Sequence, residues 1–394
     1  MAWKQMEIRQ QRAEFAVRVS RGEPMSALCR EYGISRPTGY LWCGRFASEG
    51  IAGLDNRSQR PQHSPAQTPA RVEARIVQLR RARPDWGARK LAVLLSKEGD
   101  RVPVITVHRV LLRHGLVLAP DRRSPATQRF ERARPNELWQ MDFKGQKENQ
   151  AAIGPLSVLD DHSRYVTALE QTGTARGEAV RERLEGVFAA NGLPEEMLMD
   201  HGVLWWNTAA PSGWTQFLVW LMKQGIRCHF SAIRHPETQG KVERFHHSLE
   251  RARTRRGAQQ QWLEQSWLDA FRHEYNHVRP HEALNMQTPA SVWAPSPRKY
   301  QPCLPDWDYG PGAEVKRLSV DGDLYVNSQR WKVSLSLAKE PVRLERCQQR
   351  ILVYYCNTIV REIDLAVQRS TAVDRWAQTP TEKQTCKGST DNAM

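Results

Sequence analysis

The chain has 394 residues, 40% of them hydrophobic, and a formal net charge of +15 at pH 7. This length allows two to four compact domains, and the apolar fraction is ordinary for a soluble globular protein. No apolar run reaches the roughly 18 residues that span a bilayer, and the N-terminus lacks the apolar stretch of a secretory signal, so we expect a cytoplasmic protein with no membrane partner. The seven cysteines form no C-x-x-C pair, and neither a zinc ribbon nor a disulfide framework is predicted.

Nearly all of the net charge lies in the first third of the chain. Residues 1–135 contain 26 Lys and Arg against 12 Asp and Glu, whereas residues 136–394 contain 32 against 31. Because neutralisation of phosphates drives most non-specific affinity for DNA, a basic segment with helical periodicity is typical of a DNA-binding module. A merely soluble cationic surface is the alternative.

Residues 1–57 are predicted to form a helix-turn-helix domain. The helical pattern is interrupted at residues 31–35, where a glycine supplies the tight turn and a serine follows as the N-cap of the next helix. In a helix-turn-helix the second helix enters the major groove, and a helical hairpin that binds protein is the alternative. The side chains that we expect near DNA are Arg36, Thr38 and Arg45. The polar stretch 58–70 is predicted to be a linker.

Residues 71–120 are predicted to form a second, helix-turn-helix-like DNA-binding domain. Three amphipathic segments follow one another, and Gly115 closes the last of them. Such segments form a small bundle whose cationic side chains can face phosphates. The candidates for DNA contact are Arg89, Lys90, Arg109 and Arg113. The stretch 121–135 that follows is predicted to be a basic linker.

Within residues 136–295 the periodicity changes to short strands that alternate with helices. Three consecutive strands are expected first, followed by helix, strand, helix, strand and a last helix that begins near Thr238. This order is that of a ribonuclease H-like α/β fold. The expected strands are 138–143, 156–160, 165–170, 196–199 and 226–230, and the expected helices between them are 177–190 and 214–223.

Three acids lie on or directly after elements of this predicted fold. Asp142 lies within the first strand, Asp200 directly after the fourth, and Glu243 in the first turns of the final helix. If the first and fourth strands are neighbours, the three carboxylates converge. Such a cluster is unfavourable when empty because like charges raise each other's pKa, and hard cations relieve the repulsion. Oxygen ligands favour Mg²⁺ or Mn²⁺ over zinc, and two such ions about 3.5–4 Å apart can serve phosphodiester displacement without a nucleotide cofactor.

Five sequence segments, three of which contain these acids, form a more specific signal than the acids alone. They are WQMDF at 139–143, VLDDHSR at 158–164, MDHG at 199–202, HPETQGKVERFH at 235–246 and YNHVRPHEAL at 275–284. Together they resemble the DDE transposase and retroviral-integrase superfamily, especially bacterial insertion-sequence transposases. The resemblance covers residues 136–294 closely and both N-terminal helical modules more loosely.

The resemblance implies roles for particular residues. Asp142, Asp200 and Glu243 would be the ligands of two Mg²⁺ or Mn²⁺ ions, while Lys241 and Arg244 carry charge suited to DNA phosphate, with Lys241 as a substrate-DNA contact. The implied enzyme acts in the bacterial nucleoid on double-stranded DNA, at the terminal inverted repeats of a mobile element and at target DNA. It exposes 3′-hydroxyls and joins them to the target, and it works as a homodimer or higher homo-oligomer.

Two other functions remain open. One is a metal-dependent nuclease of the same fold that cuts DNA without joining it. The other is a regulatory DNA-binding protein descended from a transposase, against which the presence of all three acids argues.

The sequence departs from the family pattern in two places. His201 follows the second acid where the family usually has Asn, and 42 residues separate Asp200 from Glu243, somewhat more than in typical integrases. The extra length falls at 204–214, which is either a DNA-contacting loop or a passive insertion. For His201 we favour a hydrogen bond behind the metal ligands over contact with metal-bound water.

Two further groups of polar residues have weaker claims to the site. Asp160 and Asp161 lie where the second strand turns into the third, which favours a structural turn over metal ligation. His246, His247 and Glu250 share the helix of Glu243, and their spacing alone would permit a zinc site.

The C-terminal region is predicted to be mostly β-structure. A Pro-rich connector at 296–312 leads to 313–366, where alternating apolar residues predict short antiparallel strands in a small β-barrel. This domain either binds DNA or a partner subunit or only caps the core. The polar tail 367–394 is predicted to be disordered.

Overall fold

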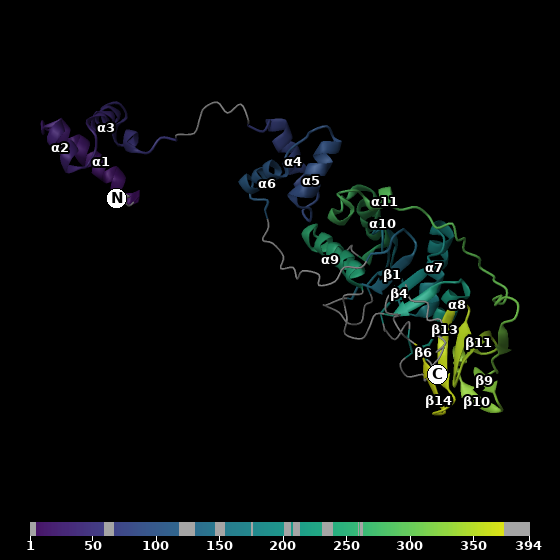
Figure 1. The fold of residues 1–394 in the computed structure, drawn as a ribbon. Coiled ribbons are helices and arrows are strands. Elements are labelled where there is room, and N and C mark those ends of the chain that lie inside the picture. The colour runs from purple at the N-terminus through teal and green to yellow at the C-terminus, as the bar shows by residue number, and fades with distance from the viewer. Residues whose placement is uncertain are drawn as a thin grey trace, which may run out of the picture. The chain divides into compact units, whose positions relative to one another are not determined.

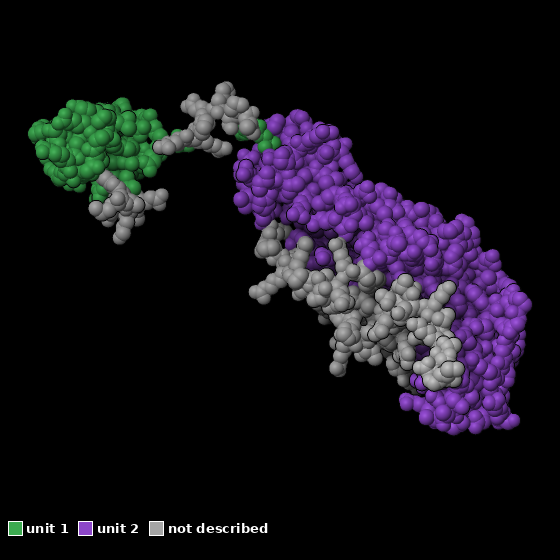
Figure 2. Space-filling view, in the orientation of Figure 1, with its two compact units in different colours: residues 1–68 green, residues 69–394 purple. Residues whose placement is uncertain are grey.

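The protein was analysed as a computed structural model that describes residues 5–58, 67–117, 131–145, 154–174, 176–200, 206–207, 213–230, 239–258, 260 and 263–373. The chain divides into two compact units, Met1–Thr68 and Pro69–Met394 (Figure 2). Within the described residues, none of the helices has both the length and the apolar character needed to cross a membrane.

Unit 1 contains the expected helix-turn-helix. Gly33 has a φ of +64° in the turn, and the Ser35 side chain accepts a hydrogen bond from the backbone N–H of Thr38 at the start of the next helix. The second and third helices approach closely at Gly39, where an added Cβ would lie 2.8 Å from Cys29 Sγ. The elements are α1 (Gln5–Ser20), α2 (Met25–Glu31), α3 (Arg36–Glu49) and η1 (Gly50–Leu54) (Figure 1).

Unit 2 begins with the second helical module. Its three helices are amphipathic and enclose a core of their own, which includes the fully buried Ile76, Trp86 and Leu95. The expected three-helix arrangement is therefore confirmed. The helices are α4 (Ala70–Ala82), α5 (Ala88–Lys97) and α6 (Val104–Arg113).

The central domain is built on a five-stranded sheet in the order β3-β2-β1-β4-β7. The first three strands pair antiparallel, whereas β4 and β7 continue the sheet in parallel with β1. The predicted order of elements is confirmed. The strands are β1 (Leu138–Phe143), β2 (Leu156–Asp160), β3 (Val166–Glu170), β4 (Glu196–Met199) and β7 (Arg227–Phe230).

Helices cover both faces of this sheet. Trp139 and Met141 belong to a core shared with α7 and α8, while Leu159 packs with α9 and α10 in a separate core. A short hairpin of β5 (Trp206–Asn207) and β6 (Gly213–Trp214) falls within the predicted 204–214 segment. The helices are α7 (Gly177–Asn191), α8 (Gln216–Lys223), α9 (Gly240–Arg255), α10 (Gln265–His273), η4 (Glu274–Val278), η5 (Glu282–Leu284) and α11 (Pro289–Val292).

The C-terminal region forms an antiparallel sheet in the order β14-β13-β12-β11-β8 and a separate hairpin of β9 and β10. In the described residues β14 and β8 remain edge strands, so the sheet is open and the predicted β-barrel is not confirmed. The elements are β8 (Glu314–Arg317), β9 (Asp323–Val326), β10 (Gln329–Lys332), η6 (Leu335–Leu337), β11 (Pro341–Cys347), β12 (Arg350–Tyr355), β13 (Thr358–Asp364) and β14 (Arg369–Ala372).

This C-terminal sheet packs directly on the central domain. The Trp214 indole donates to the carbonyl oxygen of Val360 at 3.0 Å, and Lys223 Nζ lies 3.2 Å from a carboxylate oxygen of Glu340. Apolar residues of both sheets share one core. Strand β14 extends the structure to Ala372, beyond residue 366 where we expected the domain to end. The rest of the predicted tail, from 374, lies outside the described residues.

Candidate active site

Asp142 and Asp200 come from neighbouring strands. Strand β1 pairs in parallel with β4 in the register Leu138↔Glu196. Continuing that register places Asp200, the residue after β4, beside Asp142. The side chain of Asp142 is 23% exposed and lies on the face of β1 that is covered by α9.

The electrostatics bring the third acid into the same group. Burial, together with the charges of Asp200 and Glu243, raises the pKa of Asp142 to about 7 against an opposing backbone hydrogen bond and Lys144. Glu243 is exposed in the first turn of α9, and burial of part of its carboxyl raises its pKa as well. Asp200 and Glu243 therefore both lie close enough to Asp142, at one end of β1, for their charges to act on it.

The three acids are not arranged as a preformed metal site in the part of the chain that the structure describes. Among the described residues, no group of three or more His, Cys, Asp or Glu side chains is arranged to hold a metal ion. Neighbouring carboxylates are nevertheless the donor set that a hard divalent cation prefers, and binding such an ion would offset the charges of Asp200 and Glu243 that add to burial in raising the pKa of Asp142.

Strand β1 presents a row of polar residues to α9, where a half-buried strand would usually present apolar ones. Gln140 Oε1 accepts a hydrogen bond from the N–H of Val242 at 3.2 Å, and Lys144 Nζ lies 3.9 Å from Glu250 Oε2. Between them, Asp142 Oδ2 lies 3.7 Å from His246 Nδ1. Polar contacts therefore fix how α9 sits over the strand that carries the first acid.

His246 is part of the site, although the sequence suggested only a zinc role for it. Its Nε2 lies 3.0 Å from Ser157 Oγ, and burial, with the charge of Lys144, lowers its pKa to about 3. The imidazole is therefore neutral beside Asp142. Its companion Glu250 is engaged by Arg253 at 2.5 Å, and no described metal cluster includes either residue.

Lys241 lies in the interior and is not presented as a free cation. Its Nζ lies 2.5 Å from Asp161 Oδ1, and the two side chains are 14% and 0% exposed. Burial lowers the pKa of Lys241 to about 8 despite the opposing effect of Asp161. The expected substrate contact is thus held by a buried carboxylate, whereas Arg244 is exposed on the next turn of the helix.

The turn between β2 and β3 has the structural role that the sequence predicted. Asp160 accepts hydrogen bonds from the N–H of Asn136 at 2.7 Å and from both the N–H and the hydroxyl of Ser163 at 2.7 and 2.6 Å. These contacts occupy Asp160, which makes it a turn residue. Several predicted positions, including His201 and residues 231–238 before α9, lie outside the described residues.

Most of the predicted DNA-contact residues of the second module lie in ion pairs with glutamates of this chain. Arg89 and Lys90 face Glu282 of the central domain at 3.3 and 3.9 Å. Arg113 pairs with Glu73 of α4 at 2.9 Å. Arg109 is exposed on α6 and makes no ion pair among the described residues.

A buried ion cluster between the second module and the central domain was missed from the sequence. Asp85, with a side chain 1% exposed, lies 2.8 Å from Arg256 Nη2 and 3.7 Å from Arg279 Nη1. Arg256 also pairs with Glu274 at 2.6 Å. These partners are up to 194 positions apart, from 85 to 279, so no local signal could have revealed them.

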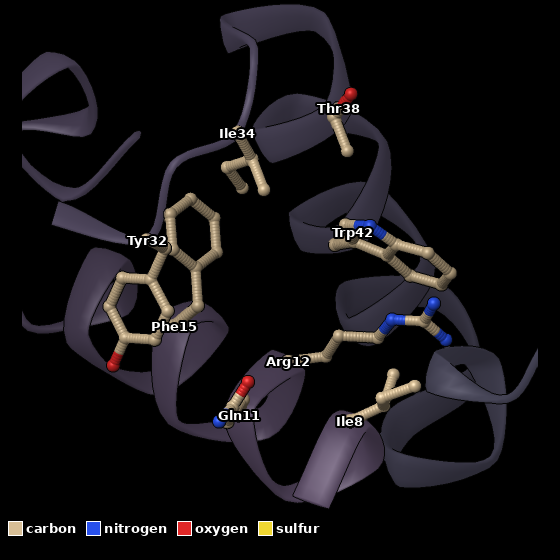
Figure 3. Close-up of a pocket in the computed structure, with 8 residues that line it drawn as sticks. All are labelled: Ile8, Gln11, Arg12, Phe15, Tyr32, Ile34, Thr38 and Trp42. Atoms are coloured by element: carbon tan, nitrogen blue, oxygen red, sulfur yellow. The ribbon is translucent and has the colours of Figure 1, made fainter. Parts of the chain in front are cut away.

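In unit 1, Arg36 is exposed at the start of α3, while Arg45 lies 5.0 Å from the ring of Trp42. Thr38 lines a small cavity of about 270 Å³ between the helices, where the Arg12 guanidinium stacks on Trp42 at 3.7 Å (Figure 3). The remaining lining residues are Ile8, Gln11, Phe15, Tyr32 and Ile34. The cavity belongs to the interior of the helix-turn-helix and not to the acidic site.

Family comparisons agree with this architecture. The description "Integrase core domain" matches residues 132–236 and again 224–289. "Helix-turn-helix domain" matches residues 11–62, and "Homeodomain-like domain" matches 38–111. The chain is thus an integrase core joined to helix-turn-helix domains of the DNA-binding type.

Two similar proteins belong to insertion elements. The IS407 uncharacterized 31.7 kDa protein of Burkholderia multivorans is 23% identical over 240 residues, which is 57% of this chain and 80% of that protein. The IS476 uncharacterized 39.2 kDa protein of Xanthomonas euvesicatoria is 24% identical over 262 residues, which is 62% of this chain and 70% of that protein. These matches support placing the chain in the DDE transposase and integrase superfamily, with relatives among the proteins of bacterial insertion sequences.

Solved structures show a weaker likeness. A simian T-cell lymphotropic virus intasome in complex with PP2A regulatory subunit B56 gamma is 17% identical with a TM-score of 0.36, over 75% of this chain and 98% of that one. The HTLV-2 integrase catalytic core domain in complex with magnesium is 15% identical with a TM-score of 0.31, over 41% and 97%. Likeness at this level leaves the function to be argued from the residues of this chain.

Proposed function

We propose that this protein is a DNA transposase that binds the ends of a mobile element, cleaves to expose 3′-hydroxyls and joins them to target DNA. The observation that carries the proposal is the β1–β4 register, which places Asp200 beside Asp142 within an integrase core, where burial and the charges of Asp200 and Glu243 raise the pKa of Asp142. Acids that repel one another in a family of DNA-processing enzymes are typical of a site for phosphoryl transfer.

Asp142, Asp200 and Glu243 are the residues that would hold two Mg²⁺ or Mn²⁺ ions. When bound, these ions supply the charge that activates the attacking oxygen and stabilises the leaving one in phosphodiester displacement. The chain's own residues hold the acids in place: the neutral His246 lies against Asp142, and α9 presents Glu243 at its first turn.

The two helical modules would select the DNA. Both match helix-turn-helix or homeodomain-like descriptions, and the net positive charge is concentrated in residues 1–135. Arg36 and Arg109, both exposed, are the cations best placed to meet phosphates or bases. Because two element ends must be processed together, a homodimer or higher homo-oligomer would be the active form.

The test is a reaction in vitro with duplex oligonucleotides that carry the inverted repeats found beside the gene. Wild-type protein with Mg²⁺ should cut at the repeat end and join the 3′ end to a second duplex. Asp142→Asn, Asp200→Asn and Glu243→Gln should each abolish both products and leave DNA binding unchanged.

Glu178→Gln is the matched control, because Glu178 is also an exposed glutamate in the first turn of a helix and should leave activity intact. Cut ends without any joined product would contradict the transposase and indicate a nuclease. Sequence-specific binding without cleavage would indicate a regulator. Activity that survives any one of the three acid substitutions would refute the site.

A further inference from the structure

The first turn of α9 is held by a contact from the sheet. The initial N–H groups of a helix have no intrahelical partners and are usually satisfied by an N-cap side chain. The N-cap residue of α9, Gln239, makes no capping hydrogen bond through its side chain to the described residues. Instead, Gln140 Oε1 of β1 accepts the hydrogen bond from the N–H of Val242 at 3.2 Å. Gln140, a strand residue, thus caps the helix in place of an N-cap side chain.

A buried carboxylate holds the capping side chain in turn. Asp161 Oδ1 accepts from Gln140 Nε2 at 2.9 Å and from Lys241 Nζ at 2.5 Å. Its other oxygen accepts from the N–H of Arg132 at 2.9 Å. Asp161 and Gln140 are both 0% exposed, so water does not compete for these bonds. Gln140, Asp161 and Lys241 form one connected group, which we call the α9 clamp.

The α9 clamp adjoins two acids of the candidate active site, one on strand β1 and one on helix α9. Gln140 precedes Asp142 by two residues on the same face of β1, a separation of about 7 Å along the strand. Lys241 and Val242 are the two residues directly before Glu243. The clamp therefore links the strand of the first acid to the helix turn of the third through a few fixed bonds.

We propose that Gln140 and Asp161 are positioning residues of the reaction, which fix the first turn of α9 and with it the placement of Glu243 relative to Asp142. This inference rests on the proposed function. It also assigns Lys241 to the clamp and not to the DNA. Misplacement of a reacting group by about 1 Å can lower a rate on the order of 100-fold, so loosening this turn should slow chemistry much more than it weakens DNA binding.

Gln140→Met tests the proposal because it keeps the size of the side chain and removes both hydrogen bonds. We expect hydrogen exchange at the Val242 amide to become about tenfold faster, the effect of losing one hydrogen bond. The single-turnover cleavage rate at saturating DNA should fall on the order of 100-fold, with the Kd for DNA within about twofold of wild type. Asp161→Asn, which keeps an acceptor for Gln140 but not the charge, should give a smaller loss of rate.

Variants of two cationic residues distinguish a role of Lys241 in the clamp from a contact with DNA. Lys241→Arg should retain most of the rate, whereas Lys241→Met should lower the rate with little change in Kd. Arg244→Met, at an exposed cation on the next turn of the helix, should weaken DNA binding instead. If Lys241→Met weakens binding as much as Arg244→Met does, Lys241 contacts DNA and the assignment is overturned.

Unchanged exchange at Val242 in Gln140→Met, or faster exchange with an unchanged cleavage rate, would also overturn the proposal. Should Gln140→Met fail to fold, Asp161→Asn carries the same measurements. The exchange experiment needs no activity, so an inactive wild-type protein would defeat the proposed function while the exchange result still decided whether the clamp fixes α9.

Discussion

Replacing Asp142 by Asn should stabilise the metal-free protein at alkaline pH. In the folded chain, burial and then the charges of Asp200 and Glu243 raise the pKa of Asp142 from 3.8 to about 7. A group with a raised folded pKa contributes its stability below its unfolded pKa, and that contribution is lost as the pH rises through about 7. A pKa difference of about 3, at about 1.4 kcal/mol per pKa unit, corresponds to a cost of about 4 kcal/mol above that pH.

Urea unfolding followed by tryptophan fluorescence, with EDTA present, measures this cost, since Trp139 is fully buried in the central core. Asp142→Asn should raise the free energy of unfolding by up to about 4 kcal/mol at pH 8.5 and by less than half of that at pH 5. Asp306→Asn is the control, because Arg317 lowers the pKa of Asp306 and no gain is expected. Equal or lower stability of Asp142→Asn at pH 8.5, or a gain that does not depend on pH, would refute the reasoning.

Three further outcomes concern stability elsewhere in unit 2. Asp85→Ala removes the anion that lies between Arg256 and Arg279, although Arg256 keeps Glu274, and should cost about 3–5 kcal/mol in urea unfolding; a cost below about 1 kcal/mol would contradict the ion cluster. Burial raises the pKa of Glu196, but a hydrogen bond from His229 and nearby cations lower this pKa below 4.5 overall. The free energy of unfolding should therefore fall as the pH drops from 4.5 through the folded pKa of Glu196. Glu196→Gln should make this loss smaller when unfolding is measured across acidic pH. Gly322→Ala should lower the melting temperature, because its Cβ would lie 1.8 Å from the carbonyl oxygen of Ser334 at a φ of +73°; an unchanged melting temperature would show that the turn adapts.

The features that the sequence predicted well are those with a local or periodic signal. Gly33 and Ser35 mark the turn of the first module because a positive φ and an N-cap each favour particular residue types. The order of the central strands follows from alternating apolar runs, and the place of Asp200 directly after a short buried strand follows from the same pattern. The approach of Asp200 to Asp142 then needs only that β1 and β4 be neighbours.

The features that could not be predicted depend on partners distant in the chain. The contact of Lys241 with Asp161, 80 positions earlier, is one of them, because nothing in the sequence near either residue indicates it. Arg89 looked free because Glu282 lies 193 positions later. Alternation of apolar residues predicts strands but does not determine whether the outer strands meet, and the C-terminal sheet proved to be open where a barrel was expected.

Helix α9 links the third acid to the second helical module, which limits how that module can be exchanged between related proteins. It is 16 residues long, about 24 Å, with Glu243 in its first turn and Arg256 at its C-terminal end holding Asp85 of the second module. A chimera that replaces α4 to α6 must therefore supply an acid at position 85, or it leaves a buried charge on the helix that presents the third acid. Unit 1 encloses its own core, so substituting a different first module leaves this linkage intact. The first module is therefore easier to exchange between related proteins than the second.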